Sequence, residues 1–149
     1  MIFELSFLGN MLGEQIAEER LKIVSRRVIS VDGGIPKIET STTGEGNYRG
    51  TEFKQTSTFW TIPKSSDGKT LYIEGRGTII TNDGELATYT GQAIGKQDGL
   101  VVNSMRFYGS IIYKTSSSGK LSSLSDVVAV FETKIDESDN AIAKIWEWK

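Results

Sequence analysis

A group of polar side chains could carry out chemistry if the fold brings them together. Glu74 and Arg76 are two residues apart in one strand-like segment, and Arg106 lies in another such segment. Residues two apart in a strand point to the same face, so this group could form a polar cluster. The candidate ligand-binding residues are Glu52, Tyr72, Glu74, Arg76, Tyr89, Gln92, Arg106 and Tyr108.

Two orientations of these side chains are open. If they point into a barrel, they line its lumen and orient an otherwise apolar ligand, and a buried carboxylate there could act as an acid or a base. If they point outward, they form the polar face that an antiparallel barrel presents to water. A shift of one residue exchanges the two interpretations, because side chains alternate strictly along a strand.

The composition excludes several classes of chemistry. The 149 residues contain no histidine and no cysteine. A Ser-His-Asp triad, a zinc-thiolate site and a disulfide framework are therefore impossible. The acidic turn at 136–140 has oxygen ligands suited to calcium, but it lacks the glycine and the distal glutamate of an EF-hand loop. We expect no metal and no cofactor.

The charges do not indicate nucleic acid or a membrane as a partner. Seventeen basic and nineteen acidic residues give a formal net charge of −2, and the two signs are interspersed. The pairs Arg26-Arg27 and Tyr48-Arg49 could contact nucleic acid, but without a basic stripe we interpret them as solvated surface. There is no signal-peptide pattern and no run of about twenty apolar residues, so we expect a cytoplasmic protein.

Runs rich in β-branched residues, separated by glycine-containing turns, predict an all-β protein. Residues 14–22 are rich in helix formers, but they continue without a stop into a β-branched run, so we favour an extended structure. The glycine-spaced segment 44–50 is not followed by a helix and predicts a bent strand or hairpin loop. The predicted strands are 2–8, 22–31, 37–43, 52–62, 70–81, 85–96, 100–114, 125–135 and 141–149, with Asp-Gly turns at 82–84 and 97–99.

The short connections between these strands determine the predicted architecture. They leave no room for crossover helices, so successive strands are antiparallel neighbours. We predict a single domain over residues 1–149, an up-and-down barrel of about eight strands, with a β-sandwich as the alternative.

One stretch and the end of the chain carry a resemblance to known proteins. With TNDGELATYTGQAIGK at 81–96 and KIWEWK at 144–149, the sequence resembles a group of small uncharacterised β-barrel proteins. Their pattern is similar to the allene oxide cyclase barrel, which is itself calycin-like. The resemblance implies about eight antiparallel strands over roughly residues 20–149, and it implies no activity, because no set of cyclase residues matches here.

Three functional hypotheses follow. The first is a barrel that binds a small apolar or amphipathic molecule in its lumen. The second is an isomerase or cyclase without histidine, in which Glu74 or Glu52 works beside a tyrosine or arginine. The third is a structural or interaction module that forms a homo-oligomer. An aromatic group could be either a ligand wall or simply core, and we favour core; it comprises Trp60, Trp146, Trp148, Phe53, Phe59, Phe107 and Phe131.

Overall fold

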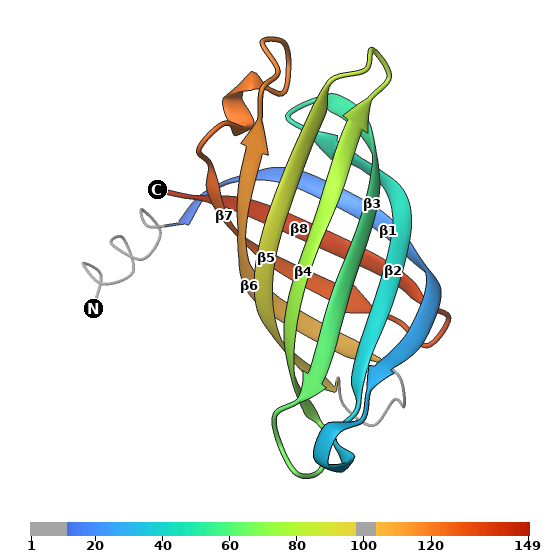
Figure 1. Ribbon diagram of the computed structural model, residues 1–149. Coiled ribbons are helices and arrows are strands. Elements are labelled where there is room, and N and C mark those ends of the chain that lie inside the picture. The colour runs from blue at the N-terminus through green and yellow to red at the C-terminus, as the bar shows by residue number, and fades with distance from the viewer. Residues whose placement is uncertain (1–11, 98–103) are drawn as a thin grey trace, which may run out of the picture.

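A closed barrel of antiparallel strands forms the protein (Figure 1). The computed structural model describes residues 12–97 and 104–149. The eight strands follow the chain in order, and the first closes the barrel by pairing with the last. They are β1 (Leu12–Ser30), β2 (Lys37–Tyr48), β3 (Thr51–Pro63), β4 (Thr70–Thr81), β5 (Leu86–Gln97), β6 (Met105–Thr115), β7 (Val128–Ile135) and β8 (Asn140–Trp148).

The predicted all-β, up-and-down barrel is therefore confirmed, and the sandwich alternative is not. The extended interpretation of 14–22 is also confirmed, because these residues lie within β1. The glycine-spaced segment forms the end of β2 and the turn at Arg49-Gly50, where Gly50 has a φ of +89°. The strand predicted at 2–8, most of the turn at 97–99 and the start of the strand at 100–114 lie outside the described residues.

Glycines on neighbouring strands make room for the large side chains of the interior. Tyr89 on β5 is paired with Gly77 on β4, and a Cβ added at Gly77 would lie 2.4 Å from the Tyr89 hydroxyl oxygen. Phe107 is paired in the same way with Gly95, where an added Cβ would lie 2.7 Å from the ring. The same relation holds for Glu19 with Gly46, Leu21 with Gly44, and Phe131 with Gly109.

A short segment between β6 and β7 closes one end of the barrel. It contains the 3-10 helix η2 (Ser122–Leu124), seen in orange in Figure 1. Leu121 and Leu124 are only 0% and 1% exposed, and both belong to the core cluster at this end. The Ser123 hydroxyl is 2.6 Å from the Tyr48 hydroxyl, and the Leu121 amide donates a 3.2 Å hydrogen bond to Glu85. These contacts fix the segment over the lumen.

The opposite end of the barrel is hollowed. It carries the β1–β2 connection with the 3-10 helix η1 (Asp32–Gly34) and the β7–β8 turn. A depression of about 530 Å³ at this end reaches down between the strands to Phe59, Phe107 and Ile135. We call this depression the mouth. Among the described residues, the barrel thus has one plugged end and one hollow end.

Replacing Gly77 with alanine tests the pairing of large side chains with glycines. The added methyl group would overlap the Tyr89 phenol, so the free energy of unfolding should fall by about 1–3 kcal/mol. In a Tyr89→Leu background the overlap is absent, and Gly77→Ala should then stabilise the strand by about 0.5 kcal/mol. Urea denaturation of the four proteins of this cycle measures both values. Equal effects in the two backgrounds would contradict the steric explanation.

Candidate functional site

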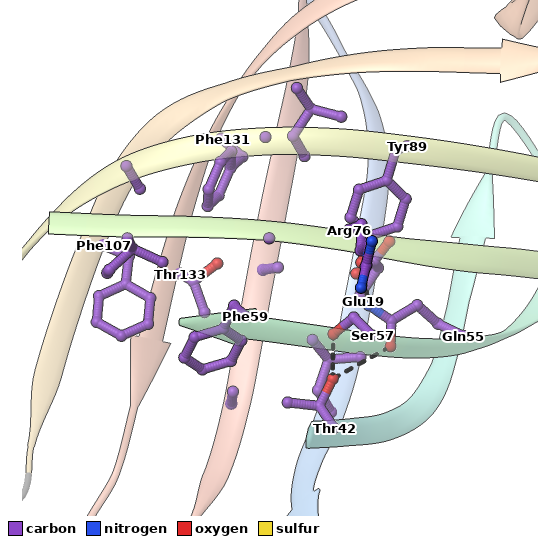
Figure 2. A pocket seen from close by; sticks show the side chains of 18 of the residues that line it. Glu19, Thr42, Gln55, Ser57, Phe59, Arg76, Tyr89, Phe107, Phe131 and Thr133 are labelled. Carbon is purple, nitrogen blue, oxygen red and sulfur yellow. Dashed lines mark hydrogen bonds between the residues drawn. The ribbon is translucent and has the colours of Figure 1, made fainter. Parts of the chain in front are cut away.

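A cavity of about 90 Å³ lies inside the barrel, between the plugged end and the mouth. It is large enough for several water molecules or a small organic molecule, and it is smaller than the pockets that hold drug-sized ligands. Figure 2 shows its lining: Glu19, Gln55, Ser57, Thr42 and Tyr89 gather at one end, and the phenylalanines gather at the other. We call it the lumen cavity.

Glu19 is the charged side chain of the lumen cavity. It lies on β1 between Gly46 of β2 and Ala143 of β8, and these two small partners leave space for its carboxyl group. The residue is only 5% exposed, and burial raises the pKa of its carboxyl from the ordinary value to about 7. Within residues 12–97 and 104–149, no hydrogen bond joins this carboxyl to another group. A buried carboxyl group with no partner of its own destabilises a fold, so its place in a cavity wall suggests a binding role.

A chain of polar side chains continues from Glu19 along the same end of the cavity. The Thr42 hydroxyl is 2.6 Å from the Ser57 hydroxyl, and it also donates a 3.4 Å hydrogen bond to the Gln55 carbonyl oxygen. The Gln55 amide nitrogen donates a 2.5 Å hydrogen bond to the Tyr89 hydroxyl. This network fixes the polar groups in position, which is the arrangement that orients a ligand.

Tyrosines near Glu19 stay uncharged. Burial raises the pKa of Tyr89 and of Tyr113 above the ordinary value, and the nearby Glu19 carboxylate adds to the effect. Their hydroxyl groups are therefore neutral donors and acceptors at any ordinary pH. Glu19 is then the group of the polar end that can change its charge near neutral pH.

The other end of the lumen cavity is apolar. Phe59 and Phe107 meet edge to face, with ring centroids 5.8 Å apart and an interplanar angle of 80°. Phe131, Ile73 and Ala93 add to this part of the wall, and Thr133 is the polar side chain that lies among the rings in Figure 2. The cavity therefore combines one hydrogen-bonding end with a hydrocarbon-like end, as a site for a small amphipathic molecule requires.

Of the eight candidate residues from the sequence, Tyr89 points into the lumen. On β4, Gly75 and Gly77 take the inward positions, so Glu74 and Arg76 point outward and are exposed. Arg76 borders the lumen cavity, but its guanidinium carbon lies 5.1 Å from the centre of the Trp60 ring on the outer face. Of the two orientations that the sequence leaves open, the outward one therefore describes Glu74 and Arg76.

The remaining candidates form hydrogen bonds on the outer surface. The Tyr72 hydroxyl donates to Glu74 at 2.8 Å and contacts Gln92 at 3.2 Å. Arg106 donates to the Tyr108 hydroxyl at 3.1 Å. Glu52 is exposed next to the inward-pointing Phe53, so it also lies outside the lumen. The outward orientation thus describes Glu52, Tyr72, Glu74, Arg76, Gln92, Arg106 and Tyr108, because aliphatic side chains, glycines or aromatic rings take the neighbouring inward positions. Like Arg76, Gln92 borders the lumen cavity next to an inward glycine.

The sequence does contain a signal for Glu19, which is not among the eight candidate residues. Alternate residues of β1 point into the barrel. Ala17, Leu21 and Ile23 are apolar members of this series, and Glu19 is its charged member. Gln55 lies between Phe53 and Ser57 on the inward face of β3, which is a mixed series and gives a weaker signal. A charged side chain within a strand face that is otherwise apolar indicates a lumen site more strongly than a cluster of polar side chains on a polar face.

The aromatic residues divide between several roles. Phe59, Phe107 and Phe131 line the lumen cavity, whereas Phe53 belongs to the core beside the plug. The Arg76 guanidinium lies over the Trp60 ring, and Trp148 is 50% exposed at the end of the chain. Part of the aromatic group is therefore a cavity wall, and the rest is core or surface.

Other kinds of site are not found in residues 12–97 and 104–149. No cluster of three or more carboxylate side chains that could hold a metal ion occurs in these two segments. The same residues include no helix long and apolar enough to cross a membrane.

The pH dependence of stability should report the burial of Glu19. Between the unfolded pKa of 4.5 and the folded pKa of about 7, the folded protein binds more protons than the unfolded chain. The free energy of unfolding should therefore fall as the pH rises through this window, by about 3 kcal/mol in total. Glu19→Gln should lack this component, so the variant should gain stability relative to the wild type as the pH rises from 4 to 8. Parallel denaturation curves for the two proteins across this range would contradict the assignment.

Comparisons with known proteins identify the fold and no more. No family model matches the sequence, and no curated protein does. A conserved protein of unknown function from Rhodopseudomonas palustris is 11% identical, with a TM-score of 0.74 over 91% of this chain and 97% of that chain. A protein of unknown function from Clostridium acetobutylicum is 13% identical, with a TM-score of 0.75 over 91% of this chain and 98% of that chain. The chain is therefore a small β-barrel similar in fold to proteins of unknown function.

Proposed function

We propose that the protein binds a small amphipathic molecule in the lumen cavity, with the polar group of the ligand at Glu19. The observation that carries this proposal is the Glu19 carboxyl itself. It is 95% shielded from solvent, lines a cavity, and has no hydrogen-bond partner among the described residues. A ligand that donates a hydrogen bond would supply that partner.

The charge of the lining defines the chemical class of the ligand. Above its pKa of about 7, Glu19 supplies a negative charge. Among the described residues, the cationic one that borders the cavity is Arg76, which directs its guanidinium to Trp60 on the outer face. A ligand carboxylate would thus meet a like charge in a poorly solvated place. The ligand should carry a hydroxyl or amine group, and fatty-acid-like anions should be rejected.

Butan-1-ol and butanoate test the site because they have similar size and opposite polar groups. Because the pKa of Glu19 is about 7, the titration is run at about pH 8.5, where its carboxyl group is ionised. Butan-1-ol should then shift the backbone amide NMR signals around Glu19 and Tyr89, and butanoate should not. Glu19→Met replaces the carboxyl with an apolar group of similar length, and it should weaken butan-1-ol binding by roughly tenfold, the loss of a hydrogen bond to a charged group.

The matched control for this titration is Glu18→Met, on the outward phase of the same strand, which should bind butan-1-ol as the wild type does. Tighter binding of butanoate than of butan-1-ol would contradict the proposed charge selectivity. Butan-1-ol shifts confined to the outer surface would contradict the lumen site.

A second candidate function is favoured by the pKa of Glu19. A carboxylate with a pKa of about 7 is suited to remove a proton from the carbon next to a carbonyl group and to return it. This would make the protein an isomerase-type enzyme without histidine. The base would be Glu19 rather than Glu74 or Glu52, which lie outside the lumen.

Exchange of deuterium from D₂O into butan-2-one tests this second candidate. Glu19 would take a proton from the ketone and return a deuteron, so the wild type should accelerate exchange above the buffer rate, with a rise in rate centred near pH 7. Glu19→Gln should reduce the rate to that of buffer, and Glu74→Gln should have no effect. Equal exchange with and without protein would exclude this activity toward small ketones. The interaction-module hypothesis stays a prediction.

A further inference from the structure

We propose that the mouth is a second ligand compartment, so that the protein binds an elongated molecule with its polar head at Glu19 and a hydrocarbon tail in the mouth. This inference rests on the proposed function and specifies the shape of its ligand. The lumen cavity, at about 90 Å³, holds the head of such a molecule and little more.

The mouth adjoins the lumen cavity directly. Phe59, Phe107 and Ile135 line both spaces, so these three side chains form the partition between them. The contact between the two rings is a single edge-to-face pair with centroids 5.8 Å apart. Phe59 and Phe107 face Gly75 and Gly95 on the neighbouring strands, so no side chain of these two partners blocks rotation of the rings. Both rings also pack against Ile73 in one apolar cluster, whose side chains would adjust while the strands stay in place.

The walls of the mouth suit a hydrocarbon tail. Below the partition, Ile23, Ile38, Leu71 and Met105 supply apolar surface from different strands, and the hollow measures about 530 Å³. Its lining also includes the hydroxyls of Thr40 and Thr61 and, toward the rim, polar and charged side chains, so the tail would lie against the aliphatic side of a mixed wall. Together with the lumen cavity, this gives the volume of an ordinary small-molecule site, several hundred Å³.

The rim of the mouth is polar and held in place. Arg26 on β1 forms two hydrogen bonds with Asp139 in the β7–β8 turn, at 2.7 and 2.9 Å. This ion pair joins two elements on the edge of the opening without filling it. The apolar compartment therefore has a hydrated boundary, where the tail of a bound molecule would end.

A series of primary alcohols distinguishes this inference from the proposed function. If the tail occupies the mouth, affinity should rise about fourfold for each added methylene from butan-1-ol to octan-1-ol, since each buried methylene contributes about 0.8 kcal/mol. Binding of butan-1-ol with no further gain at octan-1-ol would overturn the two-compartment inference and leave the lumen site intact. Absence of binding by every alcohol would overturn both proposals.

Filling the mouth provides the second arm of the experiment. Met105 lines the mouth and not the lumen cavity, so Met105→Trp should leave butan-1-ol binding within twofold of the wild type. The same variant should weaken octan-1-ol binding at least tenfold. Leu71→Trp fills the mouth from a different strand and replaces Met105→Trp if that variant does not fold.

Ile112→Trp is the matched control, because it adds the same side chain at an exposed position on the outer face of β6. It should leave the affinities for both alcohols unchanged. Equal weakening of butan-1-ol and octan-1-ol by both mouth variants would place the tail elsewhere and overturn the inference.

Discussion

The narrow lumen of a closed eight-stranded barrel is the constraint on which the rest of the structure depends. Such a barrel is just wide enough for side chains to fill it, so large residues compete for space at adjacent inward positions, as Tyr89 and its partner Tyr113 do with ring centroids 5.8 Å apart. The chain meets this constraint by placing a glycine beside the large inward residues, as with Tyr89 and Gly77 or Phe107 and Gly95. The positions of the glycines therefore determine where along the barrel axis a large side chain can point into the lumen.

The same pairing explains how a carboxyl group can be buried at Glu19. Gly46 and Ala143 on the flanking strands leave the space, while the polar chain from Thr42 to Tyr89 lines the same end of the cavity. The cost of removing a carboxylate from water appears in its raised pKa rather than in a compensating ion pair. An apolar side chain of the same size would make a more stable barrel, so the presence of Glu19 indicates a role other than packing.

The fold alone gives no function, since the two similar structures are themselves of unknown function and at most 13% identical. The two ends of this barrel differ, and this difference supports a ligand. One end is filled by Leu121 and Leu124, and the other opens into a hollow that adjoins the polar cavity. A barrel that served only as a scaffold would need neither a buried polar cavity nor a hollow beside it.

The sequence by itself determined the strands, their order and their antiparallel pairing, because β-branched runs and short glycine turns act locally and leave few alternatives. It did not determine which face of each strand points inward. On β4 most of the apolar residues and both glycines share one face and most of the polar residues share the other, but the period of two is the same whichever face lines the lumen. In the closed barrel, Glu19 and Tyr89 lie inside, whereas Glu74, Arg76 and Arg106 point outward. The cavity likewise exists only in the tertiary structure, because its volume is the space left by side chains from strands far apart in the chain.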